Sequence, residues 1–136
     1  MRIDTLSPPH FAAAIALWHD AGLTRPWNDP EEDLRRAMAG PASTVLGGWV
    51  LDTLTATAMV GHDGHRGWVY YVAVRPDARG RGFGRQMMGA CEMWLAGRGV
   101  PKIDLMVRTE NDAVLAFYRA LGYGRDDVFV MSKRLG

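Results

Sequence analysis

Apolar and polar residues follow patterns along the chain that predict short strands and amphipathic helices. Residues 2–6 (RIDTL) alternate between apolar and polar side chains, which predicts a first strand. Ser7 is a candidate N-cap that two prolines follow, so a helix should begin there and end near Gly22. The apolar side chains of this helix recur at helical spacing: Phe11, Ala14, Ile15, Leu17 and Trp18.

The segment before the second predicted helix carries strong start signals. Asp29 can cap the helix, and Pro30 stands at its first position, where a missing N–H costs nothing. Glu32 would complete a capping box with Asp29. The acidic first turn also suits the positive end of the helix dipole.

Three strands should follow these helices. Residues 44–51 and 54–61 predict two strands that form a tight hairpin through residues 52–53. Residues 61–67 (GHDGHRG) predict a turn. Residues 68–74 (WVYYVAV) are almost continuously apolar, which predicts a strand buried on both faces.

The second half of the chain predicts two more helices and two more strands. One helix should cover residues 84–97, and strands are expected at 102–107 and at 128–135. Between these strands Asn111 can cap a helix that ends at Gly122. The apolar faces comprise Met87, Met88, Cys91, Trp94 and Leu95 in the first helix, and Val114, Tyr118 and Leu121 in the second. The order β-α-α-β-β-β-α-β-α-β predicts an α/β fold, a mixed sheet with helices on its faces.

Composition indicates one ordinary globular domain, which we expect to span residues 1–136. The chain is long enough to bury a core, with 48% hydrophobic and 23% charged residues. Its formal net charge of +1 gives no general attraction to nucleic acid or to an anionic membrane. Cys91 is the only cysteine, which excludes an internal disulfide and a cysteine-based zinc cluster. We therefore expect a cytoplasmic protein without a metal, a signal peptide or a membrane span.

Residues 75–88 (RPDARGRGFGRQMM) concentrate glycine and arginine between a predicted strand and a predicted helix. A turn that enters a helix presents unpaired backbone N–H groups at the positive end of the helix dipole. Glycine lets the backbone approach a bulky anion, because no Cβ stands in the way. A Rossmann loop would need glycine where Arg85 stands, and the Gly-Lys-Ser/Thr of a Walker A loop is absent. The segment therefore predicts a phosphate site of another kind.

Two motifs resemble those of the GNAT acetyltransferases. Arg79, Gly82 and Gly84 form the pattern R-x-x-G-x-G, which resembles the coenzyme-A pyrophosphate loop of that family. Residues 111–123 (NDAVLAFYRALGY) resemble its second signature, Asn-x6-Tyr-x3-Gly-aromatic, with Val114 where alanine is common. The motifs stand in the family's order, and the resemblance covers the whole chain. The segments RPWNDPEED and DGHRG further resemble the small bacterial YpeA-type branch.

The resemblance implies the acyl-CoA N-acyltransferase fold of the family, with splayed central strands and the thioester of acetyl-CoA in the gap between them. The backbone of Val72, Ala73 and Val74 would then bind the pantetheine arm. An N–H near Val72 would polarise the thioester carbonyl, as an oxyanion hole does. The diphosphate would bind the following loop, whose residues are Arg79, Gly80, Arg81, Gly82, Phe83, Gly84 and Arg85. Since backbone N–H groups supply the geometry, losing a glycine should weaken binding more than losing one arginine.

Tyr118 matches the general acid of the family. A free phenol has a pKa near ~10, so at neutral pH it holds a proton for a departing thiolate, whose own pKa is near ~8.5. The alternative is a core tyrosine at helical spacing. Asn111 could hydrogen-bond the pantetheine arm, cap its helix, or do both.

The general base is where the sequence departs from many relatives. Family members often carry a glutamate at positions that here hold Trp68 and Met106, and neither side chain can accept a proton. The remaining candidates are a water relay or one of five side chains: His62, Asp63, His65, Asp104 and Glu110. An imidazole is attractive because its free pKa is ~6.5, although a polar turn such as GHDGH is more often only solvated. Without an evident base, the site should favour an α-amine or another weakly basic amine over an unactivated lysine.

The acceptor should bind near the first two helices, the TRPWNDP segment between them and the turn at 62–67. Trp27, Tyr70 and Tyr71 could contact it, and Arg25 could pair with an acceptor carboxylate. Alternatively, Trp27 seals the helix pair and one of the tyrosines belongs to the core. Nucleic acid is not expected as an acceptor, because no basic patch with interleaved aromatic residues is present.

Together these features predict an acetyl-CoA-dependent N-acetyltransferase that moves an acetyl group directly to a primary amine, on a protein N-terminus, a lysine or a small molecule. Cys91 falls on an apolar helix face, so we expect a buried thiol and no acyl-enzyme. A rival hypothesis is a non-catalytic module that senses coenzyme A or binds a partner. A third is a structural domain without a cofactor. The family often dimerises, and the C-terminal strand would offer an edge for a homodimer.

Overall fold

The computed structural model describes all residues from Met1 to Gly136, and the chain divides into two compact units. The first unit, Met1–Met106, contains every strand and three of the four α-helices. The second unit, Val107–Gly136, contains the fourth helix. The expectation of a single domain over residues 1–136 stays a prediction.

The regular elements follow the predicted order up to the last helix. The strands are β1 (Arg2–Thr5), β2 (Ser43–Val50), β3 (Thr53–His62), β4 (Gly67–Val74) and β5 (Ile103–Asp104). The α-helices are α1 (Phe11–Asp20), α2 (Pro30–Met38), α3 (Phe83–Ala96) and α4 (Asp112–Ala120). Short 3-10 turns at Pro8–His10 and Pro76–Ala78 precede α1 and α3. None of the helices is long and apolar enough to cross a membrane.

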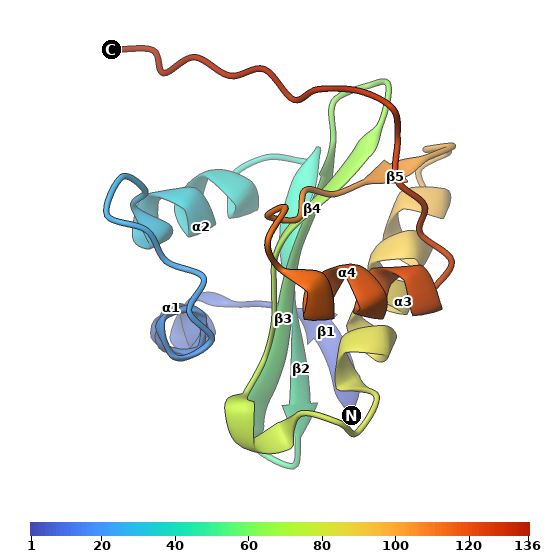
Figure 1. Cartoon of the computed structure of the whole chain (residues 1–136). Coiled ribbons are helices and arrows are strands. Elements are labelled where there is room, and N and C mark those ends of the chain that lie inside the picture. The colour runs from blue at the N-terminus through green and yellow to red at the C-terminus, as the bar shows by residue number, and fades with distance from the viewer. The chain divides into compact units, whose positions relative to one another are not determined.

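The strands form one mixed sheet in the order β1-β2-β3-β4-β5 (Figure 1). The first four strands pair antiparallel, and β5 pairs parallel to β4. Parallel neighbours need a crossover connection, which α3 supplies. In this unit α1 and α2 lie on one face of the sheet and α3 lies on the other (Figure 1). The predicted class, a mixed α/β fold, is confirmed.

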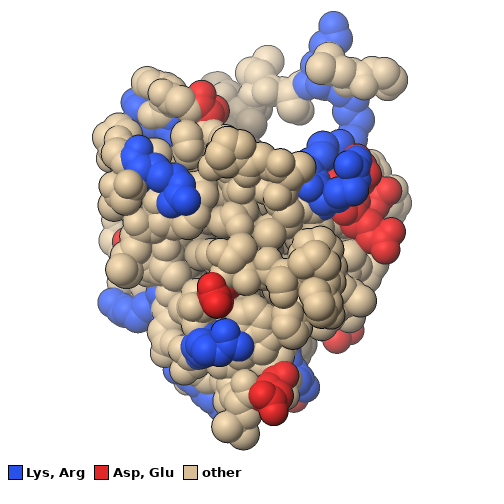
Figure 2. All heavy atoms as spheres, turned by 180° about the vertical axis from the view of Figure 1, so that it is seen from behind, with Lys and Arg blue, Asp and Glu red and all other residues tan.

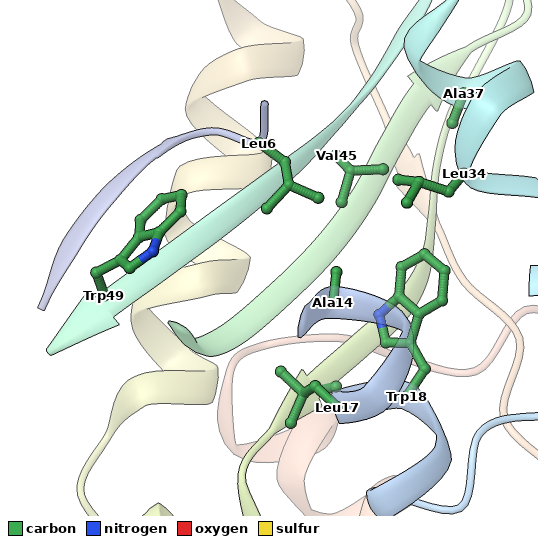
Figure 3. Close-up of a cluster of buried hydrophobic side chains, with 9 residues drawn as sticks. Leu6, Ala14, Leu17, Trp18, Leu34, Ala37, Val45 and Trp49 are labelled. Carbon is green, nitrogen blue, oxygen red and sulfur yellow. The ribbon is translucent and has the colours of Figure 1, made fainter. Parts of the chain in front are cut away.

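The core beneath α1 and α2 uses the apolar face predicted for the first helix. Ala14, Leu17 and Trp18 of α1 are buried together with Leu34 of α2 and Val45 of β2. Figure 3 shows these side chains between the two helices and the sheet. Because burying one large apolar side chain stabilises the fold by about 1.5–3 kcal/mol, this layer holds both helices against the sheet.

Helix α3 packs on the opposite face of the sheet. Met87, Met88, Cys91 and Leu95 are buried, as predicted for its apolar side. Trp94, predicted on the same side, is only half-buried, and the Arg98 guanidinium covers its ring at 3.6 Å from the ring centroid.

The predicted helix starts are confirmed in part. The Asp29 carboxylate accepts the Glu32 N–H at 3.2 Å and so caps α2. The capping box is not formed, because the Glu32 carboxylate pairs with Arg35 instead. Ser7 makes no side-chain capping bond, since the prolines after it form a 3-10 turn and α1 begins only at Phe11.

Three local predictions need correction in the sheet. The β2–β3 hairpin turns through Leu51 and Asp52, one residue earlier than expected, and Leu51 has a φ of +53°. Strand β5 covers only two residues of the predicted 102–107, because its pairing with β4 ends there. Strand β4 is not buried on both faces: Tyr70 is 43% exposed, because the core beneath the helices reaches Tyr71 but not Tyr70.

The predicted final strand at 128–135 is wrong. No strand follows Asp104, and Val128, Phe129 and Met131 are exposed. Apolar and β-branched residues favour a strand where a neighbouring strand supplies cross-strand contacts and a buried face. In this structure no strand pairs with the tail, so its composition alone does not produce one.

Removing the cap of α2 should lower stability. We expect Asp29→Ala to reduce the free energy of unfolding by about 1 kcal/mol, measured by urea denaturation, because the side-chain bond to the Glu32 N–H is lost. Asp29→Asn is the matched control, since asparagine caps a helix about as well as aspartate. Wild-type stability in Asp29→Ala, or equal losses in both variants, would contradict the capping role.

Candidate active site

The loop between β4 and α3 forms the turn predicted to bind a phosphate group. Gly80 and Gly82 both have a φ of +80°, a left-handed backbone that favours glycine. Gly82 is the N-cap of α3 and has no side chain to satisfy the helix. The N–H groups of Phe83, Gly84 and Arg85 therefore begin the helix without an intrahelical partner. These donors stand at the positive end of the helix dipole, where an anion is stabilised.

Arginine side chains add positive charge to this loop. Arg75 is neutralised by Asp77, with the two charged groups 2.9 Å apart. Arg79, Arg81 and Arg85 are exposed and take part in none of the ion pairs of the structure. On the face seen in Figure 2, charged side chains lie in several small groups, one of which joins basic and acidic side chains, with uncharged surface between the groups.

Strand β4 carries a bulge at Tyr71. Thr57 and Met59 of β3 pair with Ala73 and Tyr70, so one residue of β3 faces two residues of β4. Tyr71 has a φ of +51°, which is rare for a bulky side chain. The extra residue changes which edge of β4 each later backbone group faces.

Beyond the bulge, one edge of β4 has no neighbouring strand. Arg75 donates its N–H to the Thr55 carbonyl of β3 at 2.8 Å, so by alternation the N–H groups of Val72 and Val74 face the opposite edge. On that edge β5 pairs with only the first two residues of β4. The predicted splay of the central strands is confirmed, and it leaves strand-spaced N–H donors open to an extended ligand.

Side chains from α1, α2 and β3 hold Tyr71 in this conformation. Its ring stacks on Trp18 with the centroids 4.0 Å apart, and its hydroxyl donates to Asp33 Oδ2 at 2.8 Å. Its carbonyl accepts the Thr57 hydroxyl at 3.0 Å, and the same Thr57 oxygen accepts the Trp18 indole N–H at 2.8 Å. Burial, together with the bond to Asp33 and its charge, raises the pKa of Tyr71, so the phenol stays a donor.

One candidate base is committed to the β3–β4 turn. The Asp63 carboxylate accepts the Arg66 N–H at 2.8 Å and the His65 N–H at 2.9 Å, and these bonds hold its pKa below the ordinary value. Its second oxygen accepts the indole N–H of Trp68 at 3.3 Å. A carboxylate stabilised in this way is a weak proton acceptor, so Asp63 shapes the turn.

The other candidate bases of the first unit lie in different surroundings. Asp104 on β5 lies 3.6 Å from the Lys102 ammonium. His62 ends β3 beside Trp94, with the ring centroids 6.1 Å apart, and His65 is exposed in the turn. Glu110 belongs to the second unit, where it accepts a bond from the Thr109 hydroxyl at 3.3 Å. A role as base for any of them stays a prediction.

The residues predicted to contact the acceptor differ in their contacts and in their exposure. Arg25 donates to two carbonyls of the loop after α1, both at 2.9 Å, which ties it to that loop. Trp27 is 56% exposed, so it does not seal the helix pair. Tyr71 is the tyrosine that joins the core. Tyr70 stays exposed, although burial and then the charge of Asp63 raise the pKa of its phenol.

The second unit places Asn111 and Tyr118 on one short helix. The Asn111 side chain accepts the Val114 N–H at 3.2 Å, which confirms it as the N-cap of α4. Tyr118 lies edge-on to Phe117 and Tyr123, with centroid distances of 4.9 and 5.7 Å. The face predicted to be buried is only half-buried, since no residue of α4 is fully buried. The roles of Asn111 toward pantetheine and of Tyr118 as acid stay predictions.

The buried thiol should be inert in the native protein. Burial, with a smaller contribution from the Glu92 charge, raises the pKa of Cys91 to about 12, so very little thiolate exists near neutrality. We expect an aromatic disulfide reagent at pH 8 to modify the native chain about 10³-fold more slowly than the chain in denaturant. Equal rates would contradict a buried thiol and reopen a covalent role for it.

Comparisons with known sequences agree with these motifs. The model of the acetyltransferase (GNAT) family matches residues 12–123. The chain is 42% identical over 135 residues to an acetyltransferase of Yersinia pestis, a match that covers 99% of this chain and 96% of that protein. An acetyltransferase of Pectobacterium atrosepticum matches with the same identity and coverage.

Solved structures share the fold. An aminoglycoside N-acetyltransferase in complex with coenzyme A has a TM-score of 0.85 at 14% identity, covering 98% of this chain and 93% of that one. The ribosomal-protein-S18-alanine N-acetyltransferase of Escherichia coli has a TM-score of 0.77 at 26% identity, covering 89% and 76%. With the family model and the full-length relatives, the conclusion is direct: the chain belongs to the GNAT family of acetyltransferases.

Proposed function

We propose that the protein transfers an acetyl group from acetyl-CoA directly to a primary amine. The observation that carries this proposal is the sequence of two main-chain donor sets along β4 and α3: the open edge at Val72 and Val74, then the left-handed glycine loop. The first set suits the amides of an extended pantetheine arm, and the second suits a diphosphate. Arg79, Arg81 and Arg85 add charge around the diphosphate.

The proposed chemistry combines these donors with the acid role that the family resemblance implies for Tyr118. A neutral acceptor amine attacks the thioester carbonyl carbon, and a C–N bond forms while the carbonyl oxygen becomes an oxyanion. The Val72 N–H stabilises that oxyanion. The C–S bond then breaks, Tyr118 donates its proton to the leaving thiolate, and the nitrogen loses its proton to a base or to water. Cys91 takes no part, because its thiol is buried and protonated.

The lack of an evident general base narrows the class of acceptor amine. Asp63 is held by the turn, and the family's usual glutamate positions hold Trp68 and Met106. An α-amine, with a pKa of ~7.7–8.0, is far more often neutral at pH 7 than a lysine amine at ~10.4. We therefore favour an α-amine or a weakly basic small amine. Membership of the YpeA-type branch is part of this proposal.

A second candidate function is a coenzyme-A sensor without turnover, favoured by the same shortage of bases. An assay of thiol release over a panel of amines separates the two functions. An enzyme releases coenzyme A in proportion to the acceptor, whereas a sensor binds coenzyme A and releases none from acetyl-CoA.

The glycine loop should matter more for coenzyme-A binding than any single arginine. Gly82→Val forces a β-branched residue toward a φ of +80°, so the loop should leave this conformation and affinity should fall at least about tenfold. Arg79→Ala and Arg85→Ala each remove one exposed charge, and affinity should fall less than about fivefold. Isothermal titration calorimetry with coenzyme A measures all three.

Gly89→Ala is the control for glycine loss in this comparison. Gly89 lies inside α3 without a positive φ, and apart from the adjoining backbone of its own helix no atom lies within 4 Å of an added Cβ, so this variant should bind as the wild type does. If Gly82→Val binds coenzyme A with wild-type affinity, the diphosphate does not occupy this loop.

Loss of the Tyr118 hydroxyl should slow the release of coenzyme A. We expect Tyr118→Phe to lower kcat about 10²-fold or more while affinity for acetyl-CoA stays within about threefold, because the phenol acts on the leaving thiolate. Tyr123→Phe, in the same unit, is the matched control and should keep kcat near that of the wild type. A Tyr118→Phe variant with unchanged kcat would assign the proton to another group.

A further inference from the structure

We propose that Asp33 and Tyr71 are positioning residues for the acetyl-transfer step. Through the bond between the Tyr71 hydroxyl and Asp33, helix α2 fixes the left-handed turn at Tyr71, and this turn directs the Val72 N–H to the open edge of β4. The inference rests on the proposed function, because it assigns these residues to the same thioester site.

The conformation of Tyr71 needs an external restraint. At a φ of +51° the Cβ of an L residue crowds its own carbonyl oxygen, so a bulky residue leaves this region unless its surroundings hold it there. Glycine would remove that crowding, yet this position carries a tyrosine. The side chain itself must therefore provide the restraint.

Three elements restrain Tyr71 at both ends of the residue. The ring stacks on Trp18 of α1 with an interplanar angle of 17°, and the hydroxyl donates to Asp33 of α2. On the backbone side, the carbonyl accepts the hydroxyl of Thr57, a fully buried residue of β3. Neither the ring nor the peptide of Tyr71 can rotate without breaking one of these contacts.

The restraint reaches the neighbouring amide through peptide geometry. The Tyr71 carbonyl and the Val72 N–H belong to one planar trans peptide and point in opposite directions. Because the carbonyl points to Thr57 on β3, the N–H points away from β3, to the edge that β5 leaves open. A peptide rotation at residue 71 would turn this donor away from a thioester carbonyl.

Asp33 is suited to hold the far end of the tyrosine. Its Oδ1 accepts Arg36 at 2.7 Å, which leaves Oδ2 for the Tyr71 hydroxyl. A carboxylate is a strong acceptor for a phenol, and this one lies in the first turn of a helix that the core fixes against the sheet. The position of α2 thereby determines the direction of the Val72 N–H.

The test compares turnover with coenzyme-A affinity in four variants. Tyr71→Phe keeps the ring on Trp18 but loses the hydroxyl, and Asp33→Ala loses the acceptor. Both should lower kcat about tenfold, part of the 10²–10³-fold that a lost oxyanion donor costs, and both should keep the coenzyme-A Kd within about twofold. Asp33→Asn retains an acceptor oxygen and should recover much of the loss. Arg36→Gln removes only the ion pair of Asp33 and should match the wild type.

A second readout is independent of activity. Hydrogen exchange of the Val72 amide, followed by NMR in the acetyl-CoA complex, should be about tenfold faster in Tyr71→Phe than in the wild type, because the peptide is no longer fixed and its N–H loses the bond to the thioester carbonyl. If Tyr71→Phe fails to fold, the Asp33→Ala and Asp33→Asn pair carries both measurements, since the Asp33 side chain is only partly buried, with 24% of it exposed.

The outcomes separate this inference from the proposed function. Wild-type kcat and wild-type Val72 exchange in Tyr71→Phe and Asp33→Ala would overturn the positioning role and leave acetyl transfer intact. A fall in coenzyme-A affinity as large as the fall in kcat would also overturn it, because the site would then be generally disordered. A wild-type protein without acetyl transfer would refute the proposed function, and with it the catalytic part of this inference.

Discussion

Strand β4 has a full strand partner on only one of its two edges, and the geometry of the proposed site follows from this constraint. Strand β3 pairs along one edge, but β5 pairs with only the first two residues on the other. The N–H groups of Val72 and Val74 are left without a strand partner and can donate to a ligand. An extended chain bearing amides and a thioester carbonyl would complete the sheet where β5 departs from it.

Main-chain groups provide the donors in both parts of the proposed site of the first unit, and side chains serve mainly to hold the main chain in place. Gly80 and Gly82 allow the left-handed turn that exposes the first N–H groups of α3. At the bulge, Tyr71 adopts a similar left-handed turn because Trp18 and Asp33 hold its side chain. One turn is allowed by the absence of a side chain, and the other is enforced by the contacts of a large one.

The chain's local signals predicted much of this arrangement. The glycine loop, the caps at Asp29 and Asn111 and the apolar side of α3 depend on residues close in sequence, so their patterns could be read directly. The bulge could not be predicted in this way, because tyrosine has no preference for a positive φ and its partner Asp33 lies 38 residues away in the sequence. The prediction of a final strand failed for a related reason. The composition of residues 128–135 is a local property, whereas a strand there would need to pair with a strand distant in the sequence.

The proposed placement of coenzyme A along β4 and α3 is tested most directly by a ¹H–¹⁵N NMR titration of the full chain with coenzyme A. Amides of Val72, Val74 and residues 82–85 should show the largest shifts, with the loop amides moving downfield as they bind the diphosphate. Largest shifts on another surface, or none at saturating concentrations, would contradict the arrangement described here.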